Sequence, residues 1–138
     1  MKGLSLTNIQ KLNKFTKIPR MKDNNLIAEK SFDFAVVAVD IYKVLRFEQK
    51  EFVLSTQFLR SSTSVAANVE EAIGAQSKRD FLHKISIAYK EARETKLWIR
   101  LIKHANFIDT SKADQLLNGA EELCKILGKI QLTIKERL

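Results

Sequence analysis

Apolar residues recur every three or four positions along most of the chain, and this spacing predicts helices rather than strands. The clearest example is a helix expected over about residues 77–105. Its apolar positions alternate by four and three: Phe81, Ile85, Ala88, Ala92, Thr95, Ile99 and Ile102. A repeat of about 3.5 residues is typical of helices that pack side by side in a bundle.

Three further helices are predicted. The first covers about residues 26–47 and is apolar on more than one side, which indicates either a subunit interface or a well-covered core helix. One of its sides carries Phe32, Ala35, Val36, Val39 and Tyr42, and other sides carry Phe34, Val37, Ile41, Val44 and Leu45. The second covers about residues 51–75, and Gly74 marks its end.

The last helix is predicted from about residue 111 to 137. Its seam consists of Ala113, Leu116 or Leu117, Ala120, Leu123, Leu127, Ile130 and Ile134. The pairs Ser77 with Asp80 and Ser111 with Asp114 have the spacing of a capping box, so they are expected to begin the third and fourth helices. Gly119 and Gly128 indicate a kink or a close helix approach, and Asn118-Gly119 offers a point where the helix would split.

Short connections return each helix beside its predecessor, so the fold class expected is all-α, an antiparallel up-down-up-down four-helix bundle over residues 26–138. Residues 1–25 are expected to form a basic, mobile or irregular segment, because Pro19 and Asn24-Asn25 stop a weak amphipathic turn. This segment is either an extension upstream of a start at Met21 or a basic arm that touches an anionic partner.

The formal net charge is +8 over 138 residues, but the charge is uneven. Residues 1–25 hold six Lys/Arg and one Asp, so the predicted bundle itself is only mildly basic. High basicity alone therefore gives weak support for nucleic-acid binding. The chain shows no secretory signal and no apolar run of bilayer length, so a cytoplasmic protein without a membrane partner is expected.

Polar residues follow one face of the second helix where an ordinary amphipathic helix would carry Leu. Arg60, Ser64, Asn68 and Glu71 stand at helical spacing and form one column, which we call the polar column. The favoured interpretation is an interhelical network, in which Arg60 and Asn68 meet Glu91 or Glu94 of the next helix. The alternative is a ligand or partner site.

The third helix also carries a basic stripe away from its seam, made of Arg93, Lys96, Arg100 and Lys103. The favoured interpretation is a solvated face with local ion pairs. The functional interpretation is a nucleic-acid-binding surface that contacts phosphates, which assembly of several subunits would enlarge. Trp98 and Leu101 lie off the seam and indicate a second apolar contact, plausibly between subunits.

Catalytic and metal-binding patterns are weak. His83 and His104 are too far apart to share a metal, and Cys124, which is the only cysteine, is expected to be a small packing residue. Ser61, Ser62 and Ser64 have no adjacent histidine. No catalytic residue, cofactor or metal site is therefore expected, and the protein is predicted not to be an enzyme.

A long central motif resembles the four helix bundle protein family, also called the 23S rRNA intervening-sequence protein family. Its parts are Leu59-Arg60-Ser61, Ser64-Val65, Asn68-Val69-Glu70-Glu71-Ala72, Gly74, Ser77-Lys78-Arg79-Asp80-Phe81 and Ser86-Ile87-Ala88-Tyr89-Lys90-Glu91-Ala92-Arg93-Glu94-Thr95. The similarity spans about residues 30–138. Many relatives carry Ile and Gly where this chain has Val65 and Ala72.

The resemblance implies an antiparallel bundle that assembles as a homopentamer and has no enzymatic activity. Genes of the family often lie inside rRNA intervening sequences, and a related branch assists diversity-generating retroelements and engages reverse transcriptase and nucleic acid. The leading hypothesis is therefore a non-enzymatic homo-oligomer that binds RNA, DNA or a nucleoprotein through basic surfaces. The alternative is a protein-interaction scaffold without direct nucleic-acid binding.

Overall fold

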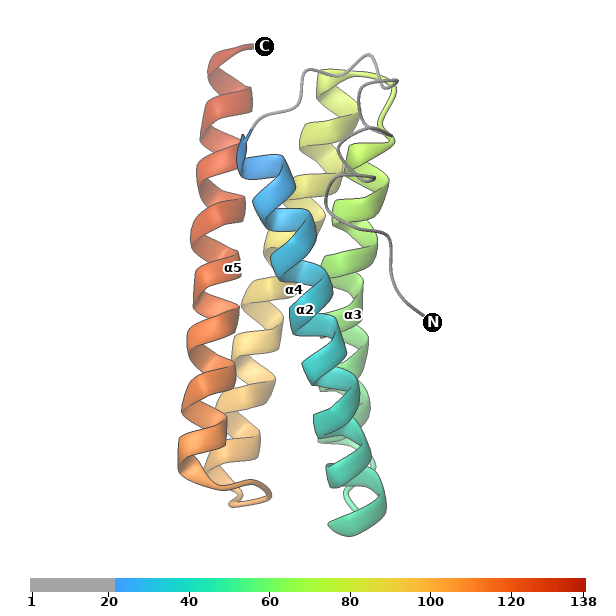
Figure 1. Ribbon diagram of the computed structural model, residues 1–138, viewed down its shortest axis with the longest axis vertical. Coiled ribbons are helices and arrows are strands. Elements are labelled where there is room, and N and C mark those ends of the chain that lie inside the picture. The colour runs from blue at the N-terminus through green and yellow to red at the C-terminus, as the bar shows by residue number, and fades with distance from the viewer. Residues whose placement is uncertain (1–21) are drawn as a thin grey trace.

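The computed structural model describes residues 22–138 and is helical throughout its regular elements (Figure 1). These are α2 (Lys22–Lys43), the π-helical turn η1 (Val44–Glu48), α3 (Leu54–Ile73), α4 (Lys78–His104) and α5 (Thr110–Glu136). Residues 22–138 contain four α-helices and no strand, which confirms the predicted all-α class. The expectations for residues 1–21, including a start at Met21, lie outside the described residues.

The helices form a bundle in which the chain reverses direction at each connection in Figure 1. Helix α3 packs against α2 and α4, and α4 packs against α5, whereas α2 and α5 are the most sparsely packed of the neighbouring pairs. This arrangement is compatible with the predicted up-down-up-down topology. The sparse packing between α2 and α5 leaves a hollow that is described below.

The core follows the predicted seams of the last two helices. Every seam position of α4, from Phe81 to Ile102, is buried, and so is the seam of α5, with Leu116 rather than Leu117 as its second member. The one polar residue in the α4 seam, Thr95, donates a 2.8 Å hydrogen bond to the Ser61 hydroxyl of α3. Its buried hydroxyl is therefore satisfied across the helix interface, as burial of a polar group requires.

Helix α2 was predicted to be apolar on more than one side, and the structure shows which of these sides the other helices cover. The buried positions are Ile27, Ser31, Phe34, Ala38, Ile41 and Leu45. On the side of Phe32, Ala35 and Tyr42 are half-buried, while Phe32, Val36 and Val39 are exposed by 64%, 46% and 39%. Both sides have helical spacing, so periodicity alone did not decide which one faces the other helices. Among the residues that the structure describes, α2 is covered mainly on the side of Phe34 and Ile41.

The ends of the helices correct several boundaries. Helix α2 begins at Lys22, so Asn24-Asn25 lies inside it instead of before it. Ser77 caps α4 as predicted, since its hydroxyl accepts a 3.1 Å hydrogen bond from the Asp80 N–H. The predicted cap at Ser111 is wrong, because the Asp109 carboxylate takes that place and accepts from the Lys112 N–H at 3.0 Å.

Candidate nucleic-acid interface

The predicted basic stripe lies along one side of α4, and its four members differ in how available their charges are. Arg93 and Arg100 are exposed, and Lys96 and Lys103 are half-buried. Lys103 is paired, because its Nζ lies 2.7 Å from Asp114 Oδ1 of α5. Three of the four cations therefore carry the excess charge of the stripe.

Two members of the stripe face a groove that α4 forms with α5. This α4–α5 groove has a volume of about 620 Å³ and includes Arg93 and Lys96 from α4 and Lys125 and Lys129 from α5. The rest of its lining is Tyr89, Glu121, Cys124, Gly128, Leu132, Thr133 and Glu136. Four cations face two carboxylates in one concave surface, which favours an anionic ligand.

Sequence reasoning missed the contribution of α5 to this groove. Lys125 and Lys129 stand four residues apart and so share one face of their helix. That spacing is a usable signal, but it does not show that the face meets Arg93 and Lys96. Only the pairing of α4 with α5 brings the four side chains together.

Arg93 is held over the edge of the groove by an aromatic neighbour one turn earlier. Its guanidinium carbon lies 5.8 Å from the centre of the Tyr89 ring, and its Nη1 donates a 3.3 Å hydrogen bond to the Tyr89 hydroxyl. Because a cation–π contact leaves the charge of an arginine intact, Arg93 keeps its full charge for a phosphate. Tyr89 positions this cation without neutralising it.

Cys124 lies inside the same groove and behaves as a packing residue. Burial raises the pKa of its thiol, and the nearby charges of Lys96 and Arg93 only partly oppose that effect. The thiol is therefore protonated at neutral pH, whereas the thiolate is the reactive nucleophile. Its half-buried position against the core fits the predicted packing role.

The lower half of the stripe belongs to a separate hollow near the α4–α5 connection. Arg100 and Lys103 line it together with His104, Asn106, Thr110 and Leu117. Since Lys103 is paired with Asp114, this hollow has a weaker positive bias than the α4–α5 groove. The structure thus divides the predicted stripe into two surfaces rather than one.

The polar column connects α3 with α4, in the manner of the interhelical interpretation. Arg60 forms ion pairs with both Glu91, at 3.3 Å, and Glu94 of α4. Glu94 also accepts a 2.9 Å hydrogen bond from the indole N–H of Trp98, which packs against the core. Trp98 is therefore held within its own chain, and of the predicted off-seam pair only Leu101 is exposed.

Asn68 departs from that interpretation. Its amide donates to the Ser64 carbonyl at 2.8 Å and to the Ser64 hydroxyl at 3.1 Å, and not to Glu91 or Glu94. The preceding turn of its own helix offers a nearer acceptor than the neighbouring helix does. The last member of the column, Glu71, lies 3.6 Å from Lys84 of α4. Two of the four members therefore bridge the helices.

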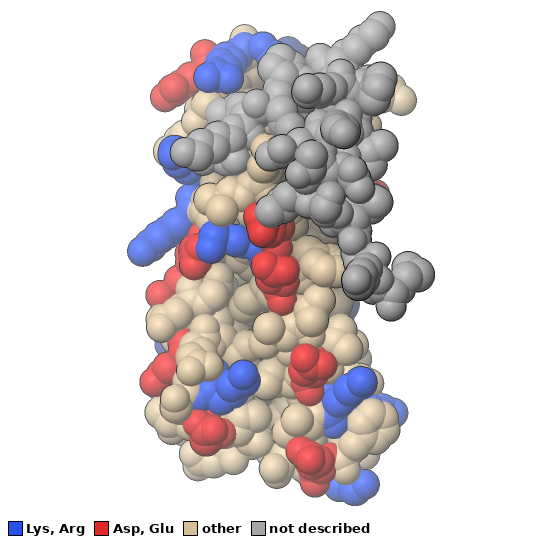
Figure 2. Space-filling model, in the orientation of Figure 1, with Lys and Arg blue, Asp and Glu red and all other residues tan. Residues whose placement is uncertain are grey.

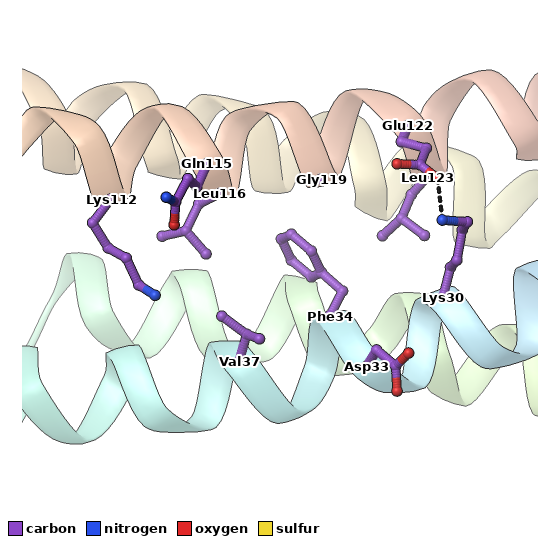
Figure 3. Close-up of a pocket in the computed structure, with 10 residues that line it drawn as sticks. All are labelled: Lys30, Asp33, Phe34, Val37, Lys112, Gln115, Leu116, Gly119, Glu122 and Leu123. Atoms are coloured by element: carbon purple, nitrogen blue, oxygen red, sulfur yellow. Dashed lines mark ion pairs between the residues drawn. The ribbon is translucent and has the colours of Figure 1, made fainter.

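A second hollow lies between α2 and α5, with a volume of about 320 Å³ (Figure 3). Phe34, Leu116 and Leu123 point into it, the ion pair of Lys30 with Glu122 stands at one end, and Lys112 stands at the other. The hydrogen bond and charge of Glu122 raise the pKa of Lys30. With Asp33 and Glu122 balancing the two lysines, this hollow has no bias toward anions.

The face of the molecule over α2 and α5 shows the same balance, since Lys/Arg and Asp/Glu alternate on it (Figure 2).

Among residues 22–138 there is no group of three His, Cys, Asp or Glu side chains that would hold a metal ion. No helix in that range is long and apolar enough to cross a bilayer. The α4–α5 groove is thus the strongest candidate site for an anionic partner.

Comparison with known proteins agrees with the resemblance of the central motif. One solved crystal structure is of a protein of unknown function from the S23 ribosomal protein family of Bacteroides thetaiotaomicron. Its sequence is 44% identical to this chain, and the two structures match with a TM-score of 0.77. The match covers 82% of this chain and 98% of that one. No curated protein matches. A family model described as 23S rRNA-intervening sequence protein matches residues 23–129. The chain therefore belongs to the 23S rRNA-intervening sequence protein family.

Proposed function

We propose that this protein is a non-enzymatic homo-oligomer of antiparallel four-helix bundles that binds RNA or DNA, alone or within a nucleoprotein. The α4–α5 groove is the proposed contact surface. The observation that carries the proposal is the convergence of Arg93 and Lys96 from α4 with Lys125 and Lys129 from α5 in one groove. The family description, which refers to 23S rRNA intervening sequences, supports RNA as the first ligand to test.

The chemistry of the groove suits a phosphate backbone better than a single small anion. Its cations come from two helices and are spread along an open groove with a volume of about 620 Å³. Neutralising several phosphates releases bound counterions, so binding to such a surface is strong at low salt and falls steeply as salt rises. The groove offers contacts that position a nucleic acid without reading its base sequence.

Charge reversal in the groove tests the proposal. In fluorescence anisotropy titrations with a structured RNA, we expect Arg93→Glu combined with Lys96→Glu to weaken binding by about tenfold or more at low salt. The matched control is Arg79→Glu combined with Lys90→Glu, which changes the net charge equally at exposed positions of the same helix outside the groove. Equal losses for the two variants would show that total charge, and not the groove, governs binding.

The alternative function is a protein-interaction scaffold, and the exposed apolar side of α2 favours it. Phe32, Val36 and Val39 lie along this side at helical spacing and remain uncovered within one chain. A contact with another protein would bury them. Recovery of a specific protein after nuclease treatment by the wild type, but not by Phe32→Asp, would favour the scaffold over nucleic-acid binding.

The proposal includes the absence of catalysis and a cytoplasmic location. Support for the first comes from how the candidate nucleophiles are used. Cys124 is held protonated by burial, and the hydroxyls of Ser61 and Ser64 accept hydrogen bonds from Thr95 and Asn68. The cytoplasmic location remains a prediction that imaging of the tagged protein would check.

A further inference from the structure

The turn between α2 and α3 lies at one end of the bundle (Figure 1), and it carries large apolar side chains that are exposed. We call residues 43–53 the α2–α3 turn. In it, Phe47, Phe52 and Val53 are exposed by 63%, 51% and 71%. Exposed apolar groups that gather in one short segment commonly mark a binding surface.

This turn is held firmly although its apolar groups are exposed. The N–H of Gln49 donates to the Val44 carbonyl at 3.1 Å, and the N–H of Glu51 donates to the Leu45 carbonyl at 2.9 Å. Leu45 within the turn and Ser55 just after it are fully buried, and the Ser55 hydroxyl donates to the Glu51 carbonyl at 2.7 Å. The exposed rings are therefore presented in a fixed arrangement, which lowers the entropic cost of binding.

Three cations lie in the same segment as the exposed rings, and one of them contacts the Phe52 ring. The guanidinium of Arg46 lies 5.9 Å from the centre of the Tyr42 ring and 5.1 Å from that of Phe52. Lys43 is exposed at the start of the segment and Lys50 in its second half, and Lys50 adopts a left-handed backbone with a φ of 56°. Non-glycine residues seldom adopt this conformation, which makes the chain turn sharply at a charged position.

The turn keeps a small positive excess, because it holds three cations and two carboxylates. Glu51 is engaged with its own backbone, because its carboxylate accepts hydrogen bonds from the N–H groups of Val53, Leu54 and Ser55. Glu48 is the other acidic residue of the segment. Exposed aromatic rings interleaved with cations are the arrangement that single-stranded nucleic acids favour, since bases stack on the rings and phosphates meet the cations.

We infer that the α2–α3 turn is a second nucleic-acid contact, specific for unpaired nucleotides, in which Phe47 stacks on a base while Lys43 and Lys50 meet the adjacent phosphates. A duplex keeps its bases stacked on one another and cannot offer them to an exposed ring. This inference rests on the proposed function, because both surfaces serve one nucleic-acid ligand. It adds that the ligand has an unpaired segment.

The test compares a single-stranded oligonucleotide with a duplex of the same length by anisotropy, using Phe47→Ala. The control is Leu97→Ala, which truncates a large apolar side chain that is 46% exposed on α4, away from the turn. We expect Phe47→Ala to weaken single-strand binding by about tenfold, the scale of one base stacked on an aromatic ring, and to change duplex binding by less than about twofold. Leu97→Ala should alter neither, and Phe47→Tyr should retain binding because its ring still stacks.

A fluorescent adenine analogue in the single strand supplies a second readout. Stacking on Phe47 predicts that its emission changes with the wild type and not with Phe47→Ala. The inference would be overturned if Phe47→Ala weakened single-strand and duplex binding equally, or if the emission did not change with the wild type. It would also be overturned if Phe47→Ala changed the oligomeric mass and left single-strand binding intact. If neither oligonucleotide binds the wild type at low salt, the proposed function and this inference both fail.

The two surfaces can also fail separately. Loss of binding on charge reversal of Arg93 and Lys96, with Phe47→Ala behaving like the wild type, would overturn the contact at the turn and leave the proposed function intact. If Phe47→Ala selectively loses single-strand binding while the charge reversal of Arg93 and Lys96 has no effect, the contact at the turn is supported. The α4–α5 groove is then not a contact surface.

Discussion

Two glycines in α5 show how single residues set the spacing between helices. A Cβ added to Gly119 would lie 3.1 Å from Cδ2 and 3.2 Å from Cε2 of the Phe34 ring on α2. A Cβ added to Gly128 would lie 3.8 Å from the Tyr89 ring on α4, which is an ordinary contact. The close approach expected near Gly119 therefore exists, while the helix runs through Asn118-Gly119 without a split.

Replacing each glycine with alanine should separate helix propensity from packing. Gly128→Ala is expected to raise the free energy of unfolding by about 0.5–1 kcal/mol, because alanine is favoured over glycine inside a helix. Gly119→Ala has the same advantage, but its Cβ forces the Phe34 ring to move, so its gain should be smaller or negative. Urea denaturation of both variants measures the difference, and a larger gain for Gly119→Ala would contradict this account of the α2–α5 contact.

At the scale of single helices, the first turn of α3 depends on the side chain of Glu51. Its carboxylate accepts hydrogen bonds of 2.9, 2.8 and 2.6 Å from the backbone N–H groups of Val53, Leu54 and Ser55. Partial burial by itself would raise the pKa of Glu51, but these hydrogen bonds outweigh it and lower the pKa below its ordinary value. Glu51 thus caps α3 from outside the helix, which explains why the helix begins at Leu54 rather than at the predicted residue 51.

This cap predicts a dependence on pH. A carboxyl whose pKa is lower in the folded state stabilises the fold above its unfolded pKa of about 4.3 and loses that contribution as pH falls through the folded value. Glu51→Gln should therefore lower the free energy of unfolding by about 1 kcal/mol at pH 7, and the difference from the wild type should shrink below about pH 4.

Urea denaturation at several pH values measures this difference. The exposed neighbour Glu48, changed to Gln, is the control and should show little effect at any of them. A difference for Glu51→Gln that stays constant from pH 7 to pH 3 would show that the charge of Glu51 does not contribute to the cap.

The helices differ in how far the sequence predicted them, and the reason is physical. In α4 and α5 one seam is clearly more apolar than the other faces, so the buried positions were predicted correctly. Helix α2 has two apolar sides, and only the packing of α3 and α5 shows that Phe34 and Ile41 are covered while Phe32 is not. The α4–α5 groove was half predicted, since the stripe on α4 is visible in the sequence but its meeting with Lys125 and Lys129 depends on tertiary structure.

At the scale of the whole molecule, the uncovered side of α2 bears on assembly. Phe32, Val36 and Val39 form an apolar stripe that a single chain leaves in water. Contact between copies would bury it and would also place several α4–α5 grooves on one particle, which raises the affinity for a long nucleic acid. Assembly and binding are thus expected to reinforce each other.

Light scattering tests this assembly. The wild type is expected to form a homo-oligomer, a pentamer on the family resemblance, at micromolar concentration. Phe32→Asp combined with Val36→Asp should shift the mass toward the monomer, because burying two unpaired carboxylates is strongly unfavourable. The paired change Lys135→Asp and Arg137→Asp at exposed positions near the end of α5 is the control. A wild type that is monomeric would contradict the proposed assembly.

The central claim is that cations of the α4–α5 groove meet phosphates, and the salt dependence of RNA binding tests it most directly. The logarithm of the association constant should fall linearly with the logarithm of the salt concentration, with a slope of about −0.7 to −0.9 for each phosphate neutralised. We predict that Arg93→Ala combined with Lys96→Ala makes the slope shallower by about 1.4–1.8, while Arg79→Ala combined with Lys90→Ala leaves it unchanged. A slope near zero for the wild type, or the same slope in the groove variant, would contradict the account.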